Sequence, residues 1–128
     1  MTKYVIDAHA WIEYFVASER GKEVREILEN EQNEIFTSSL TIAEVMSVTK
    51  REGRDFDATC ENIIINSKII DISLEFCKGA GLLHAEIRGK IRDFGLADAF
   101  VLLAARKLGA KILTGDPHFK GFKEAVLI

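Results

Sequence analysis

The stretch ADAFVLLAARKLGAKILT, residues 97–114, predicts a buried helix that leads into a buried strand. Residues 97–108 are apolar on nearly every side of a helix, which is typical of a helix in the interior of a domain. Gly109 stands where a helix-ending glycine is expected. Lys111–Thr114 then forms a short run rich in strand-forming residues. A buried helix that feeds a buried strand favours an α/β fold.

Working outward, short apolar runs alternate with segments of helical periodicity along the rest of the chain. Further strands are predicted at Lys3–Ile6, Glu34–Thr37, Lys68–Ile72 and Ala125–Ile128. Further helices are predicted at Ala8–Ala17, Lys22–Asn30, Ser39–Arg51, Asp57–Asn66 and Leu74–Arg88, with Leu40, Ala43, Val45 and Val48 as the buried side chains of the third. Such alternation predicts right-handed crossovers. We expect an α/β fold: a three-layer α/β/α sandwich around a central, mainly parallel sheet of four to five strands.

Length and composition indicate a single globular domain that spans residues 1–128. The chain is 48% hydrophobic and 29% charged, which excludes disordered, collagen-like and coiled-coil proteins. No secretory signal precedes the first strand, and the longest apolar tract, Ala99–Ala105, is far shorter than the roughly 20 residues of a membrane helix. Cys60 and Cys77 lack the spacing of a zinc ribbon. These features predict a cytoplasmic protein with reduced cysteines and no membrane association.

Four acidic residues stand next to the ends of predicted elements, and each has a purely structural explanation. Asp7 and Asp116 are suited to cap the N-terminus of the segment that follows them, and Asp116 is followed by proline. Glu44 lies three residues after Thr41, which is the spacing of a capping box. Asp98 stands at the start of the buried helix, where a carboxylate interacts favourably with the helix dipole.

The joint pattern of the four acids favours a second role. The carboxyl ends of parallel strands meet at one edge of the sheet, so Asp7, Glu44, Asp98 and Asp116 are expected to converge there. Converging carboxylates repel one another, and they are best explained as oxygen ligands of a hard cation such as Mg²⁺ or Mn²⁺. A site of this kind hydrolyses phosphodiester bonds. The four acids are therefore candidate metal ligands and catalytic residues.

Four motifs carry a resemblance to a known family: VIDA at 5–8, SSLTIAEV at 38–45, LADA at 96–99 followed by Ala104-Ala105, and LTGDPHF at 113–119. In this order and spacing they resemble the PIN domain, and more narrowly the VapC toxin nucleases of VapBC toxin–antitoxin pairs, over essentially the whole chain. The resemblance implies a metal-dependent endoribonuclease in which Asp7, Glu44, Asp98 and Asp116 form the acidic cluster and Thr114 lines it.

The resemblance also implies partners. A cognate antitoxin is expected, whose C-terminal segment blocks the acidic cleft with an arginine or lysine. A homodimer is expected too, and it would cover apolar residues such as Trp11, Phe15 and Phe56. The aromatic residues that follow the first strand, Trp11, Tyr14 and Phe15, form either this dimer face or part of the core.

Candidate contacts to an RNA substrate are less sharply indicated. His9 occupies a position where the family commonly has serine or asparagine, and it either touches substrate phosphate or is an ordinary exposed histidine in a first helical turn. Arg88 and Arg92 are candidate phosphate contacts or else a solvated helix end. The formal net charge of −3 does not exclude nucleic-acid binding, because binding depends on local potential. His84 and His118 are expected at the surface.

Other functions compete with this interpretation. A haloacid-dehalogenase-like phosphatase needs a second aspartate two residues after Asp7, where this chain has His9. A receiver domain needs paired acids after the first strand and a lysine after the last, and neither is evident. A PIN-like domain in RNA processing unrelated to a toxin stays open. So does a non-catalytic partner-binding module, although such a module predicts loss of one or more of the four acids, and all are present.

Overall fold

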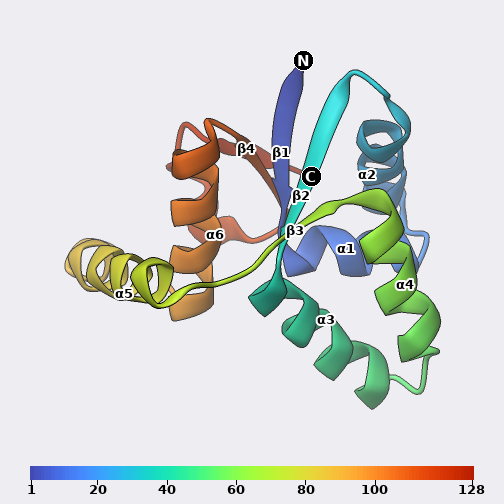
Figure 1. Cartoon of the computed structure of the whole chain (residues 1–128), viewed down its shortest axis with the longest axis horizontal. Coiled ribbons are helices and arrows are strands. Elements are labelled where there is room, and N and C mark those ends of the chain that lie inside the picture. Colours follow the sequence, from blue (N-terminus) through green and yellow to red (C-terminus); the bar gives the residue numbers. More distant parts are fainter.

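Five parallel strands form one central sheet in the computed structural model, which describes all residues from 1 to 128 (Figure 1). The strands are β1 (Thr2–Ile6), β2 (Asn33–Ser38), β3 (Lys68–Ile70), β4 (Lys111–Thr114) and β5 (Ala125–Leu127). Their order across the sheet is β3-β2-β1-β4-β5, and all four pairings are parallel. The predicted parallel sheet is confirmed, and β1 lies at its centre.

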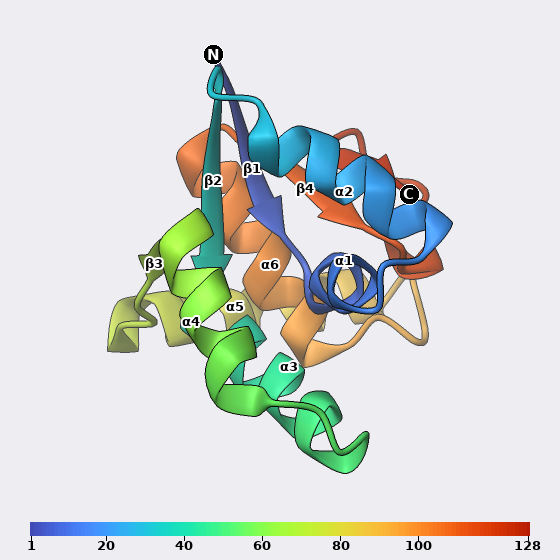
Figure 2. The same ribbon diagram turned by 90° about the vertical axis from the view of Figure 1, so that its right-hand side faces the viewer.

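Pairs of helices connect the first four strands and form the outer layers. The helices are α1 (Ala8–Phe15), α2 (Glu19–Glu29), α3 (Ser39–Arg51), α4 (Phe56–Asn66), α5 (Leu74–Arg88) and α6 (Leu96–Leu108), and a short 3₁₀ turn, η1 (Pro117–Phe119), follows β4. Figure 1 shows α5 and α6 on one face of the sheet, and Figure 2 shows α2 and α4 in front of the opposite face. The predicted three-layer sandwich is confirmed.

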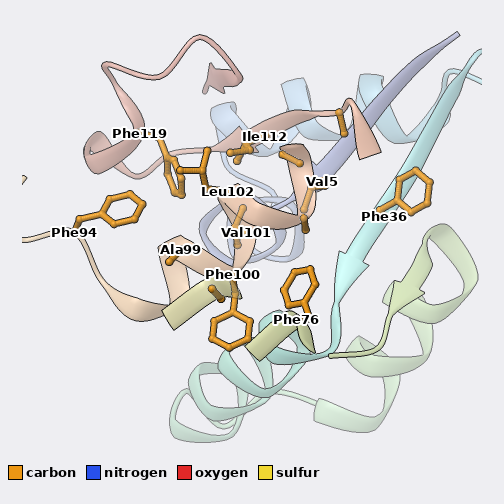
Figure 3. Packing of buried hydrophobic residues seen from close by; sticks show 14 residues of the cluster. Val5, Phe36, Phe76, Phe94, Ala99, Phe100, Val101, Leu102, Ile112 and Phe119 are labelled. Carbon is orange, nitrogen blue, oxygen red and sulfur yellow. The ribbon is translucent and has the colours of Figure 1, made fainter. Parts of the chain in front are cut away.

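Alternate residues of each strand supply the two hydrophobic cores, because successive side chains of a strand point to opposite faces. Val5 is in register with Phe36 and Ile112, and all three face α5 and α6 (Figure 3). The following residues, Ile6 and Leu113, pair with each other and contribute to the second core under α1 and α2. Burial on both faces explains why adjacent residues within a strand, such as Val5 and Ile6, are both apolar.

Trp11 belongs to the second core, so of its two expected places, the core and a dimer face, the core is confirmed. Its side chain is fully buried, and the indole N–H donates a hydrogen bond of 3.1 Å to Thr37 Oγ1. The ring stacks on Phe15 at 5.7 Å between centroids. The reason is the position of α1, which follows β1 after one residue and lies directly against the sheet. Phe56, by contrast, is 42% exposed.

Several element boundaries differ from the prediction. The first helix ends at Phe15 because Ala17 turns into the left-handed region, with φ of 55°. The next helix begins at Glu19, where the Ser18 hydroxyl accepts a hydrogen bond from an N–H of the first turn. In α3, Ala43 is exposed and Thr41 is buried instead, so the predicted burial of Ala43 is wrong. Gly109 ends α6 at a φ of +65°, as predicted.

None of the helices combines the length and apolar character that crossing a bilayer would require.

Candidate active site

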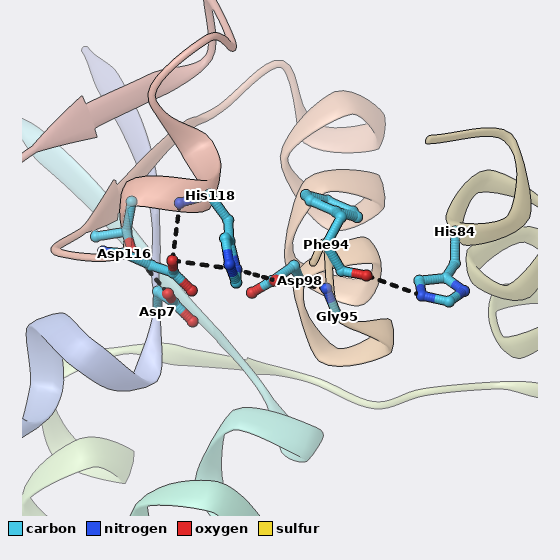
Figure 4. Close-up of polar contacts among 8 residues, drawn as sticks. Asp7, His84, Phe94, Gly95, Asp98, Asp116 and His118 are labelled. Atoms are coloured by element: carbon cyan, nitrogen blue, oxygen red, sulfur yellow. Dashed lines mark hydrogen bonds and ion pairs between the residues drawn. The ribbon is translucent and has the colours of Figure 1, made fainter. Parts of the chain in front are cut away.

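The carboxyl ends of β1 and β4 mark the point where the chain reverses its direction across the sheet. From β1 the chain proceeds to β2 and β3 on one side and then returns to β4 on the other side. Open α/β sheets form their binding crevices at such a switch point. Asp7 directly follows β1, Thr114 ends β4, and Asp116 comes two residues later. Figure 4 shows Asp7, Asp98, Asp116 and His118 gathered at this edge.

Asp7 is the most buried of the four predicted acids, with 5% of its surface exposed. Its Oδ1 accepts the Ala8 N–H at 2.8 Å, so its predicted role as the cap of α1 is confirmed. Its Oδ2 accepts the Thr114 hydroxyl at 2.7 Å. The Thr114 oxygen in turn accepts the Asp116 N–H at 2.9 Å. Burial raises the pKa of Asp7, and the bonds from Thr114 and Ala8 partly oppose that rise.

Asp98 and Asp116 are joined through His118. Asp98 Oδ2 accepts the Gly95 N–H at 2.8 Å and lies 3.2 Å from His118 Nδ1. Asp116 Oδ1 accepts the backbone N–H of His118 at 2.9 Å and lies 3.3 Å from the same Nδ1. Both carboxylate side chains are only 13% exposed. Burial is the main reason that the pKa of Asp98 is raised.

The structure corrects the expectation that His84 and His118 are surface residues. Proline at the first position of η1 turns the chain back over the sheet edge, which brings His118 into contact with two of the acids. His84 on α5 is half-buried, and its Nε2 lies 3.0 Å from the carbonyl oxygen of Phe94 (Figure 4). Sequence reasoning missed His118 because its contact with Asp98 joins segments far apart in the chain.

Glu44 projects from the second turn of α3, and its predicted capping box is wrong. The Ser38 hydroxyl caps this helix by accepting the Leu40 N–H at 3.2 Å, which places Thr41 inside the first turn, where it is buried. The Glu44 carboxylate makes no hydrogen bond or ion pair that would explain its position. Burial, together with the negative charges of Asp7 and Asp98, raises the pKa of Glu44 to about 7. Glu44 therefore belongs to the cluster electrostatically.

No lysine or arginine forms an ion pair with any of the four acids. The four acids together offer four carboxylates as donors. One carboxylate oxygen of Asp98, one of Asp116 and a ring nitrogen of His118 all lie within 4.8 Å of one another. The raised pKa values of Asp7, Glu44 and Asp98 come mainly from burial, and neighbouring carboxylates add to the rise, so added positive charge at this edge would favour the ionised forms. A hard divalent cation with oxygen ligands supplies that charge, so the residues fit such an ion.

Basic side chains flank the acids on the rim of the site. His9 is exposed on the first turn of α1. Arg20, which the sequence analysis did not single out, is exposed, makes no ion pair and lies beside Gly115: a Cβ at Gly115 would be 3.8 Å from Arg20 Nη1 and 3.9 Å from His9 Cβ. No local motif marks Arg20. Arg88 and Arg92 are exposed at the end of α5 and in the loop before α6, and their role in substrate binding stays a prediction.

Comparisons with known proteins agree with the fold. The family model of the PIN domain matches residues 4–125. Three solved structures are similar. VapC20 of Mycobacterium tuberculosis, a sarcin–ricin loop cleaving toxin, is 16% identical with a TM-score of 0.76, and the match covers 94% of this chain and 97% of that one. VapBC2 of Rickettsia felis bound to a promoter DNA fragment is 19% identical with a TM-score of 0.72 and coverages of 99% and 98%, and a toxin–antitoxin complex from Klebsiella pneumoniae is 23% identical with a TM-score of 0.69 and coverages of 96% and 95%. No curated protein sequence matches the chain.

Proposed function

The chain belongs to the PIN domain family, and on this premise we propose that it is a metal-dependent endoribonuclease and the toxin of a toxin–antitoxin pair. The observation that carries the proposal is the convergence of Asp7, Glu44, Asp98 and Asp116 at one sheet edge without a lysine or arginine partner. Three of these acids hold a raised pKa, an arrangement that the fold tolerates at a cost in stability. Such a cost is typical of functional sites.

We assign the metal site to the four acids, with Mg²⁺ or Mn²⁺ as the ion. A bound divalent ion supplies positive charge at the scissile phosphate. Asp7 and Asp98 are each oriented by a backbone N–H and keep further lone pairs for a ligand bond. Thr114 fixes the side chain of Asp7 and the backbone of Asp116 together. Glu44, whose carboxylate makes no hydrogen bond within the protein, is suited to orient the attacking water and accept its proton.

The rim of the site is suited to the RNA backbone. Arg20 and His9 lie beside Gly115, the residue that precedes Asp116. An exposed, unpaired arginine contacts phosphates and adds affinity without reading sequence, and the imidazole of His9 is suited to a hydrogen bond with a phosphate oxygen. We assign Arg20 and His9 to phosphate binding, with Arg88 and Arg92 as more distant contributors.

A cleavage assay with a matched variant tests the proposal. Asp98→Asn keeps the shape of the side chain but removes its charge, so we expect RNA cleavage in Mg²⁺ or Mn²⁺ to fall by orders of magnitude while the fold is retained. Asp57→Asn is the control, because Asp57 is an exposed aspartate in the first turn of α4. Full cleavage by Asp98→Asn, with contaminating nuclease excluded by an independent preparation, would refute the assignment.

We further propose that the protein forms a homodimer and binds a cognate antitoxin in the cytoplasm. Two of the similar structures are toxin–antitoxin assemblies. Leu74 and Leu82 on α5 are 88% and 64% exposed, as expected for side chains that a partner covers. An arginine or lysine of the antitoxin would satisfy the carboxylates in place of the metal ion. Light scattering that reports a monomer at micromolar concentration would contradict the dimer.

A further inference from the structure

We propose that His118 Nδ1 is itself a metal ligand, completing a mixed nitrogen and oxygen donor set with Asp98 and Asp116, and that this nitrogen makes the site select Mn²⁺ over Mg²⁺. The inference rests on the proposed function, because it assigns a further ligand to the same metal site.

The geometry of the three side chains already matches neighbouring positions around one ion. In an octahedral complex with bonds of about 2.1 Å, adjacent ligand atoms lie about 3 Å apart. His118 Nδ1 lies 3.2 Å from Asp98 Oδ2 and 3.3 Å from Asp116 Oδ1. The two carboxylate oxygens lie within 4.8 Å of each other, so His118 Nδ1 can occupy a position adjacent to each of them around one ion.

The backbone holds the imidazole in place. Asp116 caps η1 by accepting the backbone N–H of His118, so these two residues are positioned together. The next residue, Phe119, is fully buried and packs edge-on against Phe94 at 5.8 Å. Packing of Phe119 in the core thus fixes the position of the turn, and Nδ1 of His118 faces Asp98 and Asp116. The polar contacts of the His118 ring are all made by Nδ1.

A simpler role for His118 is that of a counterion, in which a protonated ring pairs with the two carboxylates. The two roles predict opposite effects on metal binding. A counterion competes with the metal, so removing it would strengthen metal affinity. A ligand contributes to the metal site, so removing it weakens affinity, typically about 10- to 100-fold for groups close to a bound metal.

Metal preference follows from the donor types. Carboxylates suit Mg²⁺ and Mn²⁺ alike, whereas imidazole nitrogen favours transition-metal ions over Mg²⁺. His118 should therefore add affinity for Mn²⁺ and little for Mg²⁺.

Spin-echo envelope modulation of the Mn²⁺-loaded protein tests the bond directly, because a coordinated imidazole nitrogen modulates the echo. We expect ¹⁴N modulation in wild type, its loss in His118→Asn and in His118→Gln, and its retention in His9→Asn. The last variant removes the other histidine near the acids. Titration should show Mn²⁺ affinity at least about tenfold weaker in His118→Asn, and Mg²⁺ affinity changed less than Mn²⁺ affinity. The hydrogen bond that caps η1 uses the backbone of residue 118 and survives both substitutions.

Three outcomes would overturn the inference: no nitrogen modulation in wild type, modulation that persists in both His118 variants, or Mn²⁺ affinity that rises when His118 is replaced. Mn²⁺ binding by Asp98→Asn distinguishes an incorrect His118 ligand from an incorrect metal site. If Asp98→Asn loses Mn²⁺ binding while the His118 variants keep it, the carboxylate site stands and only the His118 ligand is wrong. If Asp98→Asn also binds Mn²⁺ normally, the assigned metal site is wrong.

Discussion

Replacing Glu44 with glutamine should stabilise the metal-free protein at pH 8 and leave its stability unchanged at pH 4. The folded protein raises the pKa of Glu44 from 4.5 to about 7. Between these two values the folded state holds a proton that the unfolded chain releases, so the stability of wild type falls as pH rises through this window. Glutamine carries no ionisable proton, and the variant escapes that loss.

The size of the effect follows from the shift. At 1.36 kcal/mol per pH unit, a rise from 4.5 to about 7 gives an upper bound of about 3 kcal/mol. Glu44 is half-buried and partly screened by solvent, so we expect about 1–2 kcal/mol. For a chain of 128 residues, 1 kcal/mol corresponds to about 4 °C in Tm, so Glu44→Gln should melt about 4–8 °C higher than wild type at pH 8.

Thermal melts followed by circular dichroism in EDTA measure this difference. Glu61→Gln is the matched control, since Glu61 is an exposed helical glutamate on α4 that makes no ion pair. Glu61→Gln should have the same Tm as wild type at both pH values. The reasoning fails if Glu44→Gln and wild type melt together at pH 8, or if the variant gains equally at pH 4 and pH 8.

Three further predictions concern Thr114, Asp98 and Arg20. Thr114→Val leaves a buried oxygen of Asp7 without its donor, so urea unfolding should report a loss of about 1–3 kcal/mol, most of which Thr114→Ser should restore; equal stability of the valine variant would contradict this. Mg²⁺ or Mn²⁺ at a hundredfold excess over Kd should stabilise wild type by about 2.7 kcal/mol, and a thermal scan should show little of that gain in Asp98→Asn; an equal gain would remove Asp98 from the site. Arg20→Ala should weaken RNA binding and reduce the slope of log affinity against log salt concentration by about the amount of one phosphate contact, while metal affinity is unchanged. Binding titrations at several salt concentrations measure both quantities, and an unchanged affinity and slope would contradict the assignment.

Local patterns in the sequence determined the layers and most of the acidic cluster. Short runs rich in strand-forming residues at 3–6 and 111–114, in alternation with helical segments, predicted buried parallel strands. Asp7 and Asp116 follow those strands directly, and parallel topology brings strand ends to one edge. Their capping roles were predictable too, since a cap depends on residues within one turn.

Tertiary contacts decided the rest. Ser38 and Thr41 both have side chains that can cap the N-terminus of α3, and in the structure Ser38, the last residue of β2, is the cap. Glu44 therefore has no capping role, and its carboxylate is subject to the negative charges of the other acids. Trp11 is buried because α1 lies against the sheet. His118 meets Asp98, and Arg20 meets Gly115, only because α6, η1 and α2 begin at the same sheet edge. The contacts of Trp11, His118 and Arg20 join residues far apart in the chain, where periodicity and capping patterns carry no information and packing of the whole fold sets the distance.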